Sequence, residues 1–173
     1  MLGYVIAAFG VTWRLWANPA SMAPTNGRSV LPDIYLSAWS MRYAATAIAH
    51  ARLPALITTA VNAPQGINVM WNTTMLLPSV LLAPVTLLAG PQASLTVLIT
   101  LGFADSAAVM FAVLRRWGAG IGAAAFAGAL FGLSPALRMA AEDHYMLQAG
   151  ARWWPVCTFG QAPPCSSSRL TTR

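Results

Sequence analysis

Long apolar blocks separated by short polar connections dominate the second half of this chain. Residues 93–114 and 118–137 each run for about 20 residues with few charges, which is the length that an α-helix needs to cross a bilayer. In the second block Gly128 and Gly132 stand four residues apart, and small residues at this spacing let two membrane helices approach closely. The pattern predicts an all-α fold, a polytopic transmembrane helix bundle.

Two further apolar blocks are interrupted or short. Residues 75–90 contain Pro78 and Pro84, and prolines interrupt helices because they lack the backbone N–H group. This block either crosses the membrane as a broken helix or enters and leaves it on the same side. Residues 2–12 are also apolar, but Arg14 follows before the block reaches bilayer length, so we expect a short helix or the end of a longer one.

The stretch from Asp33 to about Arg52 has a helical period but too many polar groups to cross a bilayer comfortably. Tyr35, Trp39 and Tyr43 recur every four residues, which places them on one helical face. Asp33 follows a proline and can accept hydrogen bonds from the N–H groups of a first turn, so it is a candidate N-cap. We predict an interfacial helix whose aromatic face meets lipid or the bundle.

A polar connection, residues 63–74, leads from this region into the apolar blocks. Pro64 and Gly66 favour a turn, and Trp71 has an indole ring of the kind that rests at headgroup level. We expect residues 54–74 to be irregular and to close the first large external loop, which begins near Asp33 and lies over the bundle.

The composition agrees with a membrane protein. The chain is 57% hydrophobic and only 8% charged, with a mean hydropathy of +0.60, whereas soluble domains carry about 25% charged residues. The formal net charge of +6 has no lysine contribution. Because no basic cluster is interleaved with aromatic residues, we expect contacts with membrane lipid and none with nucleic acid. The predicted location is the cell membrane, with several passes.

The last part of the chain, residues 153–173, abruptly loses the membrane character. It holds Cys157 and Cys165 without histidines at metal-ligand spacing, so it predicts no metal site, and two cysteines alone do not establish a disulfide. We expect residues 1–152 to form a partial membrane domain and residues 153–173 to be an irregular, non-native tail of a truncated chain.

Two acidic features are candidates for chemistry. Asp33 can serve as a general base at the membrane surface, and its simpler role is the N-cap already described. Glu142, Asp143 and His144 form the densest polar cluster of the chain. Such runs are usually solvated loop ends, and the functional alternative is a second acidic element facing Asp33, with His144 carrying a proton or contacting a phosphate.

A third acidic residue, Asp105, lies inside the block 93–114, where a charge is costly. No second ionisable residue shares the block. We therefore favour a structural interpretation, in which Asp105 is neutral by protonation or hydrogen-bonded to Ser106 or Thr100, over a functional intramembrane group.

The charged residues give conflicting predictions of the membrane topology. The Arg115–Arg116 pair predicts a cytoplasmic end after the block 93–114, which puts residues 142–144 outside. Asp33 lies outside as well only if an odd number of crossings separates it from this arginine pair, and the blocks 75–90 and 93–114 would make two. Either the block 75–90 is re-entrant, or the arginine pair faces outward. We expect both acidic features on one side, where one site can use them together.

The order of these features resembles the N-terminal part of bacterial polytopic membrane glycosyltransferases of the GT-C superfamily, which use polyprenyl-phosphate sugars. The resemblance covers roughly residues 30 to 150. The matching residues are Pro32, Asp33 and Trp39; Pro64, Gly66, Asn68, Trp71 and Asn72; Pro84, Gly90 and Pro91; Arg115 and Arg116; and the segment Gly132 to Pro135 ahead of the acidic loop.

The resemblance implies an inverting sugar transfer from a polyprenyl-phosphate sugar lipid to an external acceptor. Asp33 matches the acidic catalytic residue of the first external loop, and His144 matches a histidine that often follows the Ser-Pro segment. A divalent metal ion or Arg42 would steady the lipid phosphate. The candidate catalytic residues are Asp33, Asp143 and His144, and the candidate substrate-binding residues are Arg42, Glu142, Asn68 and Asn72.

The family continues for several hundred residues, so the resemblance makes residues 1–152 a partial glycosyltransferase-like domain and the chain an inactive fragment as it stands. The alternative is a non-enzymatic small membrane protein, or a transporter or scaffold component, in which the same acidic residues only terminate helices. The donor sugar, the acceptor and the oligomeric state stay open.

Overall fold

The computed structural model describes residues 1–19, 31–71 and 75–143. These residues are mostly helical, with one short hairpin. The helices are α1 (Leu2–Ala17), α2 (Leu31–Ala49), α3 (Leu76–Leu81), α4 (Ala83–Ala89), α5 (Pro91–Arg116), α6 (Ile121–Gly132) and α7 (Pro135–Asp143). The hairpin strands are β1 (Ile57–Thr58) and β2 (Ile67–Asn68), and a 3-10 turn, η1 (Val69–Trp71), follows them.

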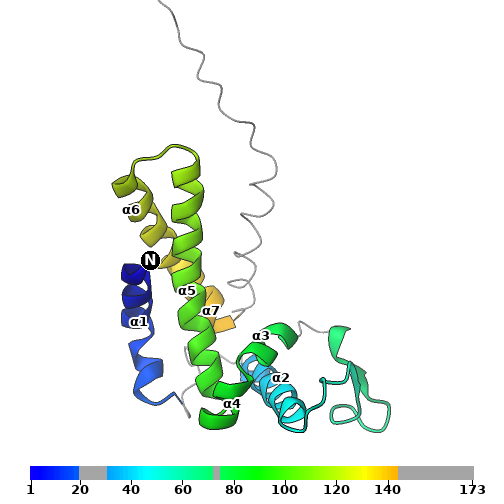
Figure 1. Ribbon diagram of the computed structural model, residues 1–173. Helices are drawn as coiled ribbons and strands as arrows, with labels where there is room; N and C mark the ends of the chain where they lie inside the picture. Colours follow the sequence, from blue (N-terminus) through cyan, green and yellow to red (C-terminus); the bar gives the residue numbers. More distant parts are fainter. Residues whose placement is uncertain (20–30, 72–74, 144–173) are drawn as a thin grey trace, which may run out of the picture.

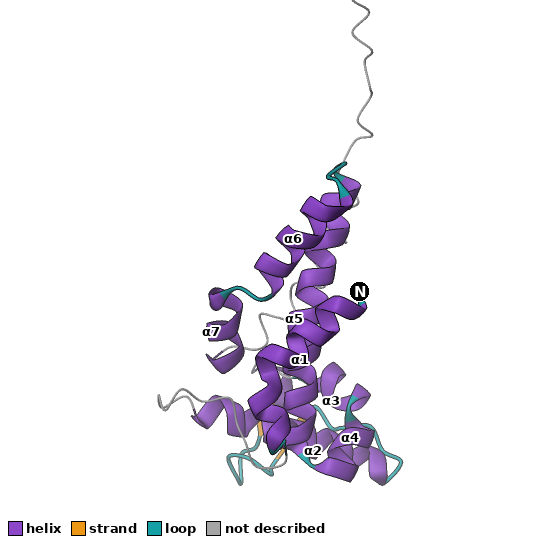
Figure 2. Ribbon diagram, turned by 90° about the vertical axis from the view of Figure 1, so that its left-hand side faces the viewer, coloured by secondary structure: helices purple, strands orange, loops and turns teal. Residues whose placement is uncertain are grey.

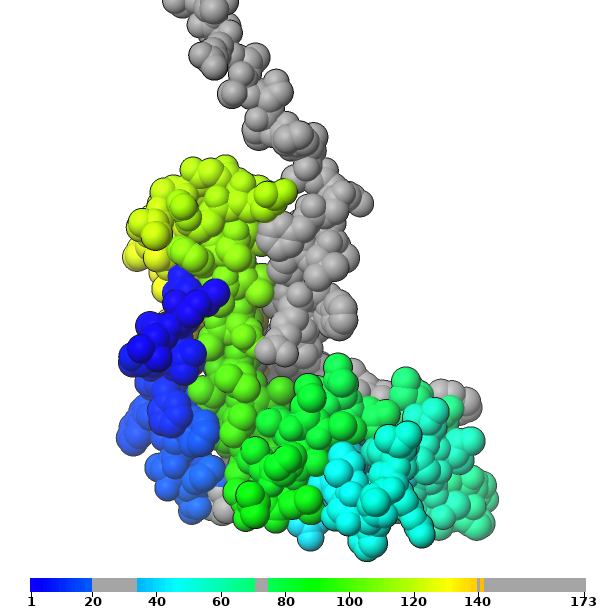
Figure 3. All heavy atoms as spheres, in the orientation of Figure 1, coloured from blue at the N-terminus to red at the C-terminus, as the bar shows by residue number. Residues whose placement is uncertain are grey.

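The central element is α5, whose 26 residues span about 39 Å at 1.5 Å per residue. The helices α1 and α6 lie against it, and α2, α3 and α4 gather at its N-terminal end (Figures 1 and 2). In the space-filling view the region of α2 and the hairpin projects sideways from this end (Figure 3). The described residues therefore form a tall part built on α5 and a lower part built on α2.

Two stretches are long and apolar enough to cross a membrane, Pro91–Arg116 and Ile121–Met139. The first confirms the block predicted at 93–114. The second is not the continuous helix expected over 118–137, because α6 ends at Gly132 and α7 begins at Pro135. Proline has no N–H group for the helical ladder and its ring clashes with the preceding turn, so the chain bends there.

The proline-broken block 75–90 does not form a bilayer-length helix. It folds into α3 and α4, and Gly90, with a φ of +91°, turns the chain into α5. Pro84 and Pro91 lie in the first turns of α4 and α5, where the missing N–H has no helical partner to lose. Within the described residues, α5 is therefore the one bilayer-length helix between α2 and the Arg115–Arg116 pair.

The loop after α2 is more ordered than expected, because residues 54–74 include a hairpin. The strands β1 and β2 pair antiparallel, with Ile57 opposite Asn68. Gly66 has a φ of +73°, and a Cβ at this position would lie 2.8 Å from the carbonyl oxygen of Thr58. The close approach of the two strands thus requires glycine. The Ala63–Pro64 peptide bond in the connection is cis.

The start of α2 differs from the prediction for Asp33. The helix begins at Leu31, so Asp33 lies within the first turn and is not the N-cap. Pro32 is compatible with a first turn because the N–H groups there have no intrahelical partner. A carboxylate in a first turn still interacts favourably with the positive end of the helix dipole.

The aromatic face of α2 points away from the core of the bundle. The buried face carries Ile34, Ala38 and Met41. Opposite it, the rings of Trp39 and Tyr43 are stacked 5.1 Å apart. The hydroxyl of Tyr43 donates a 3.1 Å hydrogen bond to the carbonyl oxygen of residue 55, so the loop after α2 partly covers this face.

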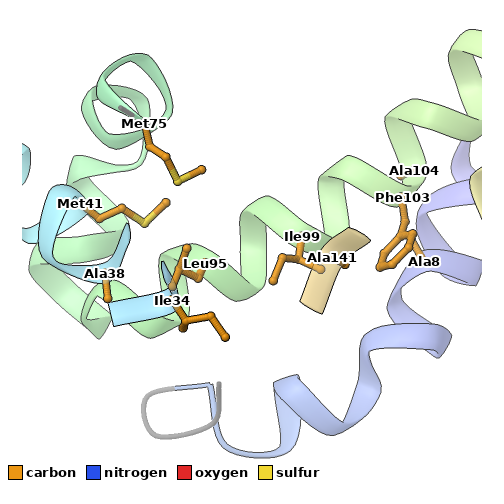
Figure 4. Close-up of a cluster of buried hydrophobic side chains, with 10 residues drawn as sticks. All are labelled: Ala8, Ile34, Ala38, Met41, Met75, Leu95, Ile99, Phe103, Ala104 and Ala141. Atoms are coloured by element: carbon orange, nitrogen blue, oxygen red, sulfur yellow. The ribbon is translucent and has the colours of Figure 1, made fainter. Parts of the chain in front are cut away.

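A single hydrophobic cluster runs along α5 and joins the lower part of the molecule to the tall part (Figure 4). It takes residues from α1, α2, α5 and α7 and from the start of α3. Its buried members are Ala8, Ile34, Ala38, Met41, Met75, Leu95, Ile99, Phe103, Ala104 and Ala141.

The contact between α5 and α6 confirms the prediction from the glycine spacing. A Cβ on Gly132 would lie 2.4 to 2.7 Å from atoms of Ala107, and one on Gly128 would lie 2.7 Å from the carbonyl oxygen of Ala107. The two backbones touch because neither glycine carries a side chain, which increases dispersion contacts along the whole interface.

Hydroxyl groups join α5 to its other neighbours. Thr12 of α1 and Thr100 share a 2.9 Å hydrogen bond between their hydroxyl oxygens, and the indole N–H of Trp16 donates to the same Thr100 oxygen at 3.0 Å. Thr86 of α4 and Ser94 share a similar bond of 2.8 Å. Polar contacts of this kind tie helices together where no water competes for them.

Candidate functional site

The first acidic candidate lies where α2 meets the N-terminal third of α5. Asp33 is the third residue of α2, and its neighbour Ile34 is 2% exposed in the core cluster. Figure 4 shows Ile34 beside Leu95 of α5. The side chain of Asp33 lies outside the described part of the structure, so its position is fixed here by the backbone.

The second acidic candidate returns to the same stretch of α5. Glu142 and Asp143 are the last residues of α7, and the preceding Ala141 is 3% exposed in the same cluster. Figure 4 shows Ala141 beside Ile99, one helical turn from Leu95. The structure therefore brings two chain segments about 110 residues apart in sequence to one end of α5, which is the arrangement expected for a shared site.

Several predicted site residues lie partly or wholly outside the described part of the structure. The side chains of Glu142 and Asp143 lie outside the described residues, as do His144 and Asn72 with all their atoms. The proposed tail, residues 153–173, also falls outside the described ranges. The predictions for these residues remain predictions.

Arg42 is not next to the acidic end. It is exposed on α2 and lies nine residues beyond Asp33, which is about 13 Å along the helix and half a turn around it. The structure therefore does not bring together the carboxylate and the guanidinium that were expected to act on one donor phosphate.

Asn68 stabilises the hairpin and the turn that follows it. Its side-chain oxygen accepts a 2.9 Å hydrogen bond from the N–H of Met70, and its backbone pairs with Ile57. An asparagine that bonds the backbone two residues ahead stabilises a turn. Because the loop here packs near Tyr43, Asn68 lies beside the far half of α2, away from the residue-33 end.

Asp105 lies in the upper half of α5, ten residues or about 15 Å beyond Leu95. The expected hydrogen bond to Ser106 is absent, since the Ser106 hydroxyl is buried without a partner in the described part of the chain. The Thr100 hydroxyl is engaged by α1 and by the carbonyl oxygen of Thr96. Asp105 does have an interaction partner, and its position along α5 separates it from the acidic end.

The described residues show no set of side chains that could bind a metal ion. Among the described residues no group of three His, Cys, Asp or Glu side chains is arranged to hold a metal ion. The side chains of Asp33, Glu142 and Asp143 lie outside the described part of the structure, and the divalent ion stays an expectation from the resemblance.

A shallow hollow between α2 and the loop was not predicted from the sequence. It is lined by Ser40, Tyr43, Val69, Met70 and Leu76. The Ser40 hydroxyl donates to the carbonyl oxygen of residue 36, so the lining is essentially apolar. No local pattern reveals this hollow, because its walls come together only when the hairpin folds back on α2.

No protein-family model matches the chain, and neither a curated protein nor a solved structure gives a significant match. Function therefore has to follow from the chemistry of the residues and from their placement around α5.

Proposed function

We propose that this chain is an integral membrane protein of the glycosyltransferase type, with α5 crossing the bilayer and the acidic end of the bundle at the outer surface. The donor is a sugar on a polyprenyl phosphate, and the acceptor is a hydroxyl group presented from outside. The proposal combines the sequence resemblance with the apolar character of α5 and the region α6–α7.

The observation that supports it best is the placement of the charges along α5. The acidic segments around Asp33 and Asp143 meet its N-terminal third, whereas Arg115 and Arg116 form its C-terminal end. Arginines flanking an apolar helix favour the cytoplasmic side. The acidic segments then lie together on the outer side, where a lipid-linked donor and a soluble acceptor can meet.

In this proposal Asp33 acts as the general base. Its carboxylate takes the proton of the acceptor hydroxyl while that oxygen attacks the anomeric carbon. The bond from this carbon to the phosphate oxygen breaks, and polyprenyl phosphate leaves with the electron pair. Glu142 and Asp143 form the second wall of the site, and His144 carries a proton to or from it.

Although the resemblance implies an inactive fragment, the two acidic segments meet at one end of α5 within this chain, so the proposal is tested on the chain itself, as donor turnover in lipid vesicles. We expect release of polyprenyl phosphate above the level of empty vesicles, and a fall of about a hundredfold or more in Asp33→Asn, which is the usual contribution of a general base. Asp105→Asn is the matched control, because it also removes one carboxylate but lies on α5 away from the acidic end. Equal turnover in the wild type and Asp33→Asn, or none in either, contradicts the proposal.

A second candidate is a non-enzymatic component of a larger membrane assembly. The observation in its favour is the exposed apolar surface of α6, where Ile121, Phe126 and Leu130 are each more than half exposed. A surface of this kind can pack against lipid or against further helices. The turnover experiment separates the two candidates, since an assembly component releases no polyprenyl phosphate.

A further inference from the structure

The segment that leaves α2 combines cations with strongly exposed apolar side chains. Leu53 is 89% exposed, Leu56 50% and Ile57 70%. Large aliphatic side chains so close together are unusual on a surface that faces only water. Arg52 precedes them, and Arg42 lies on the adjoining helix with its side chain exposed.

These arginines have no counterion from their own region of the chain. The sequence contains no Asp or Glu between residues 34 and 104, although Arg42, His50 and Arg52 all fall in that interval. Neither Arg42 nor Arg52 forms an ion pair within the described residues. The balancing negative charge must therefore come from another chain region, from solvent or from a binding partner.

Hydrogen bonds hold the apolar segment against the basic part of α2. The N–H of Arg52 donates to the carbonyl oxygen of residue 47 at 2.9 Å, which reverses the chain at the end of the helix. The bond from Tyr43 to Ala55 then holds the returning chain beside the residue that follows Arg42. We call this surface the loop edge, and it consists of Arg42, Arg52, Leu53, Leu56 and Ile57.

We propose that the loop edge docks on anionic phospholipids of the bilayer that α5 crosses. The guanidinium groups bind lipid phosphates, and the aliphatic side chains enter the boundary between headgroups and acyl chains. A lipid surface fits both properties, because it offers negative charge and apolar depth within a few ångströms. The proposal rests on the membrane placement of α5, and it is independent of sugar transfer.

The test places a spin label on the loop edge of the full chain. The label is attached at Ile57→Cys, with Cys157→Ser and Cys165→Ser removing the other thiols, in bilayers of phosphatidylcholine with or without phosphatidylglycerol. We expect phosphatidylglycerol to shield the label from a water-soluble nickel chelate and expose it to oxygen. Each arginine near an anionic surface favours binding about fivefold. Replacing both in Arg42→Gln with Arg52→Gln should therefore lower the ratio of inserted to free loop edge about 25-fold.

Two controls make each outcome decisive. Arg115→Gln with Arg116→Gln changes the same amount of charge at the opposite end of α5 and leaves the label at 57 unaffected. A label at Leu101→Cys, on an exposed position of α5, reports whether the helix is in the bilayer.

Three results would overturn the proposal. If the label at 101 is in the bilayer but the label at 57 is equally accessible to the chelate in both lipid mixtures, the loop edge faces water. If the label at 57 inserts equally with and without anionic lipid, phosphate binding plays no part. If the label at 101 is itself in water, α5 does not cross the bilayer, and the proposed function fails together with the lipid surface.

Discussion

The interface between α5 and α6 and the contact between α2 and its hairpin hold the chain together in different ways. In the first, Gly128 and Gly132 lie directly against Ala107, because neither glycine carries a side chain of its own. In the second, an exposed hydrogen bond from Tyr43, whose ring stacks on Trp39 of the same helix, joins α2 to the loop at Ala55. The first contact depends on two glycines that have no side chain, and the second depends on the hydroxyl group of one tyrosine.

This difference predicts how each region responds to change. A close-packed interface cannot give way without moving a backbone, so even one added methyl group is costly. An exposed hydrogen bond can be replaced by water, so its loss costs little and has local effects. Substitutions in the tall part should therefore unfold the bundle, and those in the lower part should only loosen the loop.

The largest effect is expected for Gly132→Ala. The added Cβ would lie 2.4 Å from the Cβ of Ala107 and 2.6 Å from its backbone nitrogen, and such overpacking costs about 1 to 3 kcal/mol. The measurement is unfolding in mixed micelles by titration with a denaturing detergent. Gly122→Ala is the matched control, because nothing lies within 4 Å of its added methyl group.

Gly122→Ala should be neutral or stabilising by up to about 1 kcal/mol, since alanine is the better helix former. If both substitutions shift the midpoint equally, the contact between α5 and α6 is not as close as described.

A smaller effect is expected for Thr100→Val. This change keeps the shape of the side chain but removes the oxygen that Thr12 and Trp16 share. Hydrogen bonds between membrane helices contribute about 0.6 to 1.7 kcal/mol each, so we expect a loss of about 1 kcal/mol. In Thr96→Val the lost hydroxyl bonds only to the carbonyl oxygen of residue 92 in its own helix. An equal loss in both variants would show that the bond to α1 contributes nothing.

The smallest effect is expected for Tyr43→Phe, which removes the hydrogen bond to Ala55 and keeps the stack on Trp39. Because the bond is exposed, the free energy of unfolding should fall by about 0.5 kcal/mol or less. Hydrogen exchange should accelerate in residues 50–71 and stay unchanged in α5. Faster exchange throughout α5 would mean that the two regions are not separable in this way.

The features predicted from the sequence are those encoded by neighbouring residues. The apolar run of α5 and the glycine spacing of α6 are local patterns, and both predictions are confirmed. The break between α6 and α7 was missed although Pro135 marks it, because the apolar composition continues across the proline. The hairpin was missed because its strands have two residues each, too few to show an alternating pattern.

The candidate site could be predicted only in part, because its parts come from distant segments. The sequence identifies Asp33 and Asp143 as acidic residues beside helices. Their meeting at one end of α5 depends on two events that no short pattern reports: α3 and α4 stay at the N-terminal end of α5, and α6 with α7 returns there. The resemblance implies a role for Arg42 in the same site, but the helical period of α2 does not show how far along the helix a site extends.

The central claim is that both acidic segments lie at the N-terminal end of α5, opposite the arginine pair. Double electron–electron resonance between spin labels tests it directly, with Tyr35→Cys paired in turn with Met139→Cys and Trp117→Cys, and the native cysteines replaced by serine. These three positions are exposed. We predict a separation of about 30 Å or more for 35–117, from the helical rise between Leu95 and Trp117, and a clearly shorter one for 35–139. A 35–139 distance equal to or longer than the 35–117 distance would contradict the claim.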